Sequence, residues 1–241
     1  MPGATARVNR AVDHRFFIGV SLGIVLLVFA GFARTYFLKG LFGAPPLTAL
    51  VHLHGAIMTL WVALFVAQVS LISLHRVAIH RKLGYGGIFL AGLVVVMGIV
   101  VSFGLARRRL LAHPDSVDAP MLLGLQLFGM VLLFIAFVTL GVLYRRRPDY
   151  HKRFMALAML SVMGPAITRL PIALVQDNGI MTVVLLNIGL VLLVVIADAI
   201  LQRRLHPVFA WGAGALIASV FVVAGFAQTP FWIQATKRLV L

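Results

Sequence analysis

The stretch that decides the fold is residues 181–201, which read MTVVLLNIGLVLLVVIADAIL. Only Asn187 and Asp198 interrupt it with strongly polar side chains. At a rise of about 1.5 Å per residue, a helix of this length crosses a hydrocarbon layer of about 30 Å. The stretch therefore predicts a membrane-spanning helix.

Similar apolar stretches recur along the chain of 241 residues, which is 62% hydrophobic, too apolar for a water-soluble protein. We expect an all-α integral membrane helical bundle of about seven transmembrane helices, forming a single domain over residues 1–241. Within the fifth span, Gly164, Pro165 and Pro171 predict a kinked or interrupted helix, because proline cannot donate a backbone hydrogen bond. The predicted spans are 16–38, 48–74, 85–106, 119–144, 154–175, 181–201 and 208–228.

The lysines and arginines predict the orientation of the bundle. If the predicted spans alternate in direction, 13 of the 21 lysines and arginines lie at the end that carries the basic segment 1–15, and 8 lie at the other end. Because cytoplasmic loops are enriched in these residues, we expect a cytoplasmic N-terminus and an outside C-terminus in a bacterial inner membrane. The net charge of +15 is spread between apolar spans, which favours anionic lipid headgroups as partners and argues against nucleic acid.

The residue types that are missing limit the chemistry. The chain has no cysteine, and all six of its acidic residues are aspartates. A cofactor must therefore be held by histidine, methionine or weaker ligands, and covalent haem attachment through C-x-x-C-H is excluded. A proton relay of several buried carboxylates is also unavailable. The common motifs of hydrolases, zinc proteases and nucleotide-binding proteins are absent.

Two histidines stand in the segment VHLHG, at residues 51–55. His52 and His54 are two residues apart, so a helix turns them about 200° from each other. His54 shares its face with Trp61, whereas His52 shares a face with small residues. We expect His54 to point into a pocket and to be a cofactor or metal ligand, with His52 as the reserve candidate. The alternative is that both imidazoles contact headgroups, water or a carbonyl group at the membrane interface.

A second pair of histidines begins two later helices. His80 opens the segment HRKLGYGG and His151 opens the segment HKRFM, and both helices leave the same side of the membrane. The two imidazoles are therefore predicted to lie at similar depth and to be candidate metal or cofactor ligands. The alternative is that each one contacts lipid phosphate at a positive helix N-terminus.

A few further polar residues fall within the spans, namely Gln126, Arg169 and Asn187. Together with Trp61 and His54 they predict a polar pocket around the proline-broken fifth span. Arg169 is the most costly of them inside a membrane, at roughly 2.5–3.5 kcal/mol if it lies at the centre of a helix. An anion, a cofactor carboxylate or a carbonyl group of the broken helix would offset that cost, or the side chain would reach the interface.

The order of these features resembles a family of uncharacterised bacterial multi-pass membrane proteins. The resemblance covers residues 48–175 and includes FVAQVSL, HRKLGYGGIFLAG, RRRPDYHKRFMALAML and ITRLP. Phe154 stands where the family pattern has tryptophan. The residues on the pattern are His54, His80, Arg81, Leu83, Gly84, His151, Phe154, Met155 and Arg169.

A weaker similarity is to the two-haem b-type membrane cytochromes, which hold haem between histidines of neighbouring helices. That similarity implies that His80 and His151 are the axial ligands of a haem b. His54 on the second span would then need a partner on the fourth span, residues 119–144, which carries no histidine.

Two classes of function remain open at this point. The first is a redox-active membrane protein that binds haem b or another cofactor and moves electrons between a quinone-like donor and an acceptor. The second is a non-enzymatic transporter, channel or accessory membrane subunit that binds a small molecule in the polar pocket. A homo-oligomer or a larger membrane complex is compatible with both.

Overall fold

The computed structural model describes residues 2–115, 117–177 and 179–241, with side chains from residue 12 onward. The predicted basic segment 1–15 therefore lies largely outside the described side chains. Within the described residues the fold is all-α, and six helical segments are long and apolar enough to cross a membrane. They are Val12–Phe37, Ala49–Ser73, Val77–Ala112, Asp118–Leu143, Gly179–Gln202 and Pro207–Ala227.

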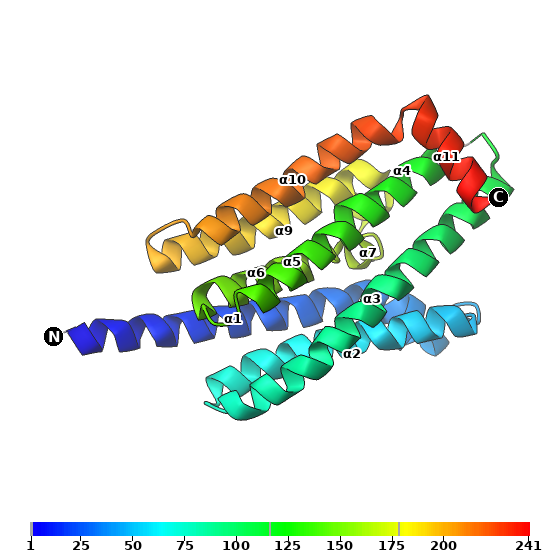
Figure 1. Ribbon diagram of the computed structural model, residues 1–241. Coiled ribbons are helices and arrows are strands. Elements are labelled where there is room, and N and C mark those ends of the chain that lie inside the picture. The colour runs from blue at the N-terminus through cyan, green and yellow to red at the C-terminus, as the bar shows by residue number, and fades with distance from the viewer. Residues whose placement is uncertain (1, 116, 178) are drawn as a thin grey trace.

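The chain passes back and forth between the two ends of the bundle, and residues 148–177 make one of these passages (Figure 1). We call the end where α1 begins the amino end and the end that carries α11 the carboxyl end. The elements that build the bundle are α1 (Pro2–Phe32), η1 (Ala33–Phe37), η2 (Lys39–Phe42), α2 (Ala49–Ser73), α3 (Val77–Ala112), α4 (Asp118–Gly124), η3 (Leu125–Val131), α5 (Leu132–Leu143), α6 (Pro148–Ser161), α7 (Gly164–Ile167), α8 (Ala173–Asp177), α9 (Gly179–Gln202), α10 (Pro207–Ala227) and α11 (Pro230–Val240).

The fifth predicted span, residues 154–175, is not one continuous helix. The chain there forms three short helices, α6, α7 and α8, because the segment bends before Pro165 and again at Pro171. Interruption of this segment was predicted from the same prolines and is confirmed. The termini nevertheless lie at opposite ends of the bundle, so the broken segment makes one passage between the ends (Figure 1).

The broken segment is packed closely against its neighbours. A Cβ added to Gly31 of α1 would lie 2.2 Å from the carbonyl oxygen of Ala166 in α7, so the two backbones nearly touch. A Cβ on Gly164 would lie 3.6 Å from the amide nitrogen of Asn187 in α9 and 4.0 Å from the sulfur of Met130 in η3. The helix break is therefore enclosed by α1, η3 and α9.

Two segments of π-helix interrupt otherwise regular spans. The segment η1 ends the first span, and η3 separates α4 from α5. A π-turn contains more residues per turn than an α-turn, so it changes which side chains share a face. Arg34 lies in the first of these segments and Gln126 in the second.

A short amphipathic helix, α11, covers part of the carboxyl end (Figure 1). It begins at Pro230 after a cap in which the Thr229 hydroxyl accepts from the Trp232 backbone N–H at 3.3 Å. The indole N–H of Trp232 donates to the carbonyl oxygen of Pro120 at 2.8 Å, which fastens α11 to α4.

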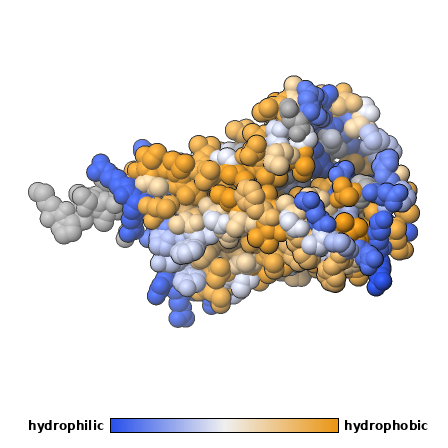
Figure 2. Space-filling view, turned by 90° about the horizontal axis from the view of Figure 1, so that it is seen from above, coloured by the Kyte–Doolittle hydropathy of each residue, from blue (hydrophilic) through white to orange (hydrophobic). Residues whose placement is uncertain are grey.

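The outside of the bundle is apolar between its two ends. Figure 2 shows a band of hydrophobic side chains with hydrophilic residues gathered toward each end. Leu26, Leu185 and Leu193 expose 68%, 61% and 66% of their surface from the middle of helices, which would be unfavourable in water. The chain is a multi-pass membrane protein.

Candidate functional site

The centre of the candidate site is a pair of histidines at the amino end. His80 lies in the first turn of α3 and His151 in the first turn of α6. The centres of their rings are 6.1 Å apart, and the ring planes are nearly perpendicular at 89°. Both side chains are half-buried. The structure thus brings together two residues that are 71 positions apart in the sequence.

His151 is held by the backbone of the neighbouring helix. Its Nδ1 lies 2.7 Å from the carbonyl oxygen of Gly141 in α5. A Cβ on Gly141 would come within 2.8 Å of the sulfur of Met155, so glycine permits the close approach of α5 and α6. If Nδ1 carries the proton and donates to this carbonyl, the Nε2 atom has a free lone pair.

His80 is contacted by Gln68 of α2. In the amide orientation that satisfies both of its ends, Gln68 donates to His80 Nδ1 at 2.7 Å and to the His80 carbonyl oxygen at 3.2 Å. Its amide oxygen then accepts from the backbone N–H of Gly84 at 3.2 Å. Three helices, α2, α3 and α6, therefore meet at this pair. Sequence reasoning missed Gln68, although it stands within the motif FVAQVSL.

A buried ion pair fixes α6 next to the histidines. Arg153 donates to both carboxylate oxygens of Asp198 in α9, at 2.8 and 3.0 Å, and the two side chains are only 2% and 1% exposed. Arg153 also donates to the carbonyl and carboxylate oxygens of Asp149 at 3.0 and 3.3 Å. Its guanidinium lies over the ring of Phe209, 5.6 Å from the ring centre. The sequence signal for the pair was the single carboxylate inside an apolar span.

A partly exposed layer of charges surrounds that pair. Lys152 forms ion pairs with Asp13 of α1 and with Asp149, the latter at 3.1 Å, and Gln202 donates to Asp13 at 3.1 Å. His206 begins α10, where its Nδ1 accepts from the backbone N–H of Val208 at 3.2 Å. Burial lowers the pKa of His206, and the nearby charges of Arg153 and Arg204 add to that effect. The layer joins α1, α6, α9 and α10.

The amino end holds a second histidine contact. The rings of His14 in α1 and His75 in the turn after α2 have centres 6.5 Å apart and lie edge to face. His75 adopts a left-handed backbone conformation with φ of 59°, which lets the chain reverse between α2 and α3. No group of three or more histidine, aspartate or glutamate side chains gathers into a metal site among the described residues.

The residues predicted for the pocket near the carboxyl end are buried to different degrees. His52 is exposed beside the ring of Tyr36, with the ring centres 5.9 Å apart. His54 is half-buried, and its Nδ1 has no hydrogen-bond partner within the described structure. The indole nitrogen of Trp61 and the side-chain oxygen of Gln126 are likewise buried without partners there.

Arg169 lies in the connection between α7 and α8, where it is exposed at the carboxyl end. It donates to the carbonyl oxygen of Pro165 at 2.9 Å and stacks over Phe32, 5.0 Å from the ring centre. Of the two placements considered for Arg169, the structure therefore favours the membrane interface and not the centre of a helix. Asn187 remains inside, beside the helix break at Gly164.

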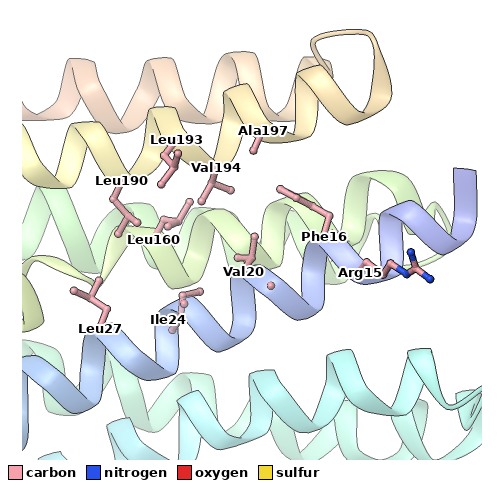
Figure 3. A pocket seen from close by; sticks show the side chains of 12 residues that line it. Arg15, Phe16, Val20, Ile24, Leu27, Leu160, Leu190, Leu193, Val194 and Ala197 are labelled. Carbon is pink, nitrogen blue, oxygen red and sulfur yellow. The ribbon is translucent and has the colours of Figure 1, made fainter.

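An apolar groove of about 340 Å³ runs along the bundle between α1 and α9 (Figure 3). Leu160 of α6 lies beneath it, and Gly19 and Gly23 open its wall because a Cβ there would meet nothing within 4 Å. Arg15 and Phe16 stand at its amino end, next to the charged layer around Asp13.

The comparisons with known proteins give no family for this chain. No family model matches it, and neither the curated proteins nor the solved structures contain a significant match. The resemblance in the motifs around His80 and His151 therefore has no independent support from these comparisons.

Proposed function

We propose that this protein is a redox-active membrane protein that binds haem b, or another metal-centred cofactor, between His80 and His151. The observation that carries the proposal is the placement of the two rings, with centres 6.1 Å apart and one ring nitrogen anchored to Gly141. Two imidazoles that each held one metal ion through a ring nitrogen would have a similar separation. Metal–nitrogen bonds of about 2 Å, plus the distance from nitrogen to ring centre, add up to about 6 Å.

The donor set fits a non-covalently held haem. Histidine pairs are established axial ligands, and this chain has no cysteine for covalent attachment. The hydrogen bond from His151 Nδ1 to Gly141 is the kind of outer contact that orients a metal-bound imidazole. Helices α3 and α6 are not packed closely against each other, and most of the contacts of α6 are made with α5 and α10.

Gln68 would set the protonation of His80. With its amide nitrogen toward His80 Nδ1, the imidazole proton of the neutral ring resides on Nε2. A half-turn of the amide would place its oxygen at the same position, where it would accept from Nδ1–H and free Nε2 for a metal. A reversed amide would, however, set its oxygen against the His80 carbonyl oxygen and its nitrogen against the Gly84 N–H. A metal held by His80 Nε2 would therefore have to displace this contact with Gln68.

A bound haem would supply reversible one-electron chemistry, and the chain's own residues would orient it and exclude water. The Arg153–Asp198 pair acts as a positioning contact, because it fixes the helix that carries His151 against α9.

The groove between α1 and α9 offers an apolar site for the isoprenoid tail of a quinone-like donor (Figure 3). Its amino end lies beside the Asp13–Lys152 pair, one residue from His151.

Visible spectroscopy of protein made with added haem precursor tests the proposal. We expect a Soret band and sharpened α and β bands after dithionite reduction, with one haem per chain in a pyridine haemochrome assay. His80→Leu and His151→Leu should each abolish the six-coordinate spectrum, and the control His52→Leu should retain it. A colourless preparation without bound metal, or an unchanged spectrum in both variants, would overturn the proposal.

A second function is favoured by three unpartnered polar atoms in α2 and η3. His54 Nδ1, Trp61 Nε1 and Gln126 Oε1 are buried without hydrogen bonds inside the described structure, and leaving such groups unpaired costs about 1–3 kcal/mol each. A small polar solute or bound water would satisfy them, as in the broken-helix sites of transporters. Solute-dependent thermal stabilisation that disappears in Gln126→Leu supports this function, and stabilisation that persists refutes it.

A further inference from the structure

Two arginines from distant parts of the chain line one hollow at the carboxyl end. The hollow has a volume of about 390 Å³ and lies between η1 and the connection from α7 to α8. Its polar lining residues are Arg34, Thr35, Thr168, Arg169 and Gln176. We propose that Arg34 and Arg169 form an oxyanion site that binds the phosphate or carboxylate group of a ligand.

Each guanidinium is held in place by an aromatic ring. Arg34 lies 5.2 Å from the centre of the Phe42 ring, and Arg169 lies 5.0 Å from the centre of the Phe32 ring. Such stacking orients a planar guanidinium while leaving its edge N–H groups available. The π-turn at the end of the first span carries Arg34 to the hollow, and the bends around Pro165 and Pro171 carry Arg169 there.

Within the part of the chain that the structure describes, most of the hydrogen-bonding capacity of the two arginines is unused. Arginine has five N–H donors. Arg169 uses one nitrogen, Nη1, which donates to the Pro165 carbonyl oxygen at 2.9 Å and contacts the Thr168 hydroxyl at 3.4 Å. The remaining donors match the oxygens of a phosphate or carboxylate, which guanidinium groups bind in a two-pronged geometry.

No ion pair with a described residue balances the two arginines of the hollow. Among the described residues, neither Arg34 nor Arg169 takes part in an ion pair. No aspartate lines the hollow, although Asp177 follows the lining residue Gln176 in α8. Asp115, also at the carboxyl end, lies 3.8 Å from Lys237. Two like charges that share a hollow favour an anion between them.

The volume of the hollow indicates how large the ligand is beyond its anionic group. A volume of about 390 Å³ exceeds that of a bare phosphate ion and lies in the range of small-molecule sites. Gln176 donates to the Leu170 carbonyl oxygen at 2.9 Å, so its amide oxygen remains as an acceptor for a hydroxyl or amine group. A phospholipid headgroup and a soluble organic anion share this chemistry. The site needs neither haem nor electron transfer.

Thermal stability of the purified full chain in a non-ionic detergent tests the site. The probes are inorganic phosphate, short-chain phosphatidylglycerol and, as an uncharged comparison, short-chain phosphatidylcholine, all at matched ionic strength. The variants are Arg34→Gln and Arg169→Gln. Arg108→Gln is a control, because it removes an exposed charge near the end of α3, at the same end of the bundle.

We expect saturable stabilisation by an anionic probe, with an affinity lowered about tenfold or more in each site variant and unchanged in the control. Stabilisation by phosphate identifies a soluble anion, and stabilisation by phosphatidylglycerol alone identifies a lipid headgroup. If Arg169→Gln fails to fold, Arg169→Lys keeps the charge and should still lose affinity, because it lacks the planar fork. Stabilisation by neither anionic probe, or equal affinity in all variants, would overturn the proposal.

Discussion

The buried pair of Arg153 and Asp198 provides the sharpest test of the packing. Replacing Asp198 with leucine leaves the Arg153 charge without its main partner at a position that is 2% exposed. Removing one member of a buried pair typically costs about 3–5 kcal/mol. Arg153 would keep its contacts with Asp149 and Phe209, which places the expected loss near the lower limit, about 3 kcal/mol.

The loss should be visible as a change in melting temperature. For a chain of this size, 1 kcal/mol corresponds to roughly 2–4 °C, so we expect Asp198→Leu to lower the Tm in detergent by roughly 6–12 °C. Arg153→Met should be similarly damaging, because it leaves the Asp198 carboxylate buried alone. The double variant should recover most of the loss, since two apolar side chains in place of a buried pair are often tolerated.

A matched control is the exposed carboxylate of Asp115, which lies 3.8 Å from Lys237. Asp115→Leu should leave the Tm nearly unchanged, because exposed ion pairs contribute little. The reasoning is refuted if Asp198→Leu behaves like this control. It is also refuted if the double variant loses as much as the two single variants together, which would mean that the charges do not depend on each other.

Three further predictions follow from individual contacts. His206 has a lowered pKa owing to burial and neighbouring arginines, so the unfolded chain takes up a proton at higher pH than the folded chain. The Tm should therefore fall as the pH drops below about 6.5. His206→Asn, which keeps a capping side chain, should make the Tm less dependent on pH. Gly31→Ala should lower the Tm because its Cβ would lie 2.2 Å from a carbonyl oxygen of α7, whereas Gly19→Ala, with nothing within 4 Å, should not. Trp232→Phe should cost about 1–2 kcal/mol in the unfolding free energy, measured by denaturant titration, because the Pro120 carbonyl oxygen loses its donor.

The pattern of apolar stretches predicted most of the architecture. Six of the seven predicted spans correspond to long helices, and the broken fifth segment makes the remaining passage between the two ends of the bundle. The helix α3 is longer than predicted, because it covers Val77–Ala112 and the predicted span covers only residues 85–106. The helix α11 was not predicted, because its short amphipathic sequence does not reach the length of a span.

The candidate site was only partly accessible from the sequence. The common depth of His80 and His151 followed from their positions at the starts of two helices that leave the same side. Their partners Gln68 and Gly141 could not be predicted in this way, because they lie on other helices. Contact with them depends on how those helices are rotated and spaced. The sequence also did not show that Arg34 and Arg169 line one hollow, since this depends on a π-turn in one segment and on proline bends in another.

The sequence alone determined that this chain forms a bundle of membrane-crossing helices with its fifth segment broken. Those properties depend on the length of each apolar stretch and on the backbone chemistry of proline, and both are local. Only the tertiary structure decided which polar groups meet, such as Arg153 with Asp198 across 45 positions of the chain. The physical reason is that a helix fixes the order of its side chains, whereas its partners are fixed by how the helices turn and pack against one another.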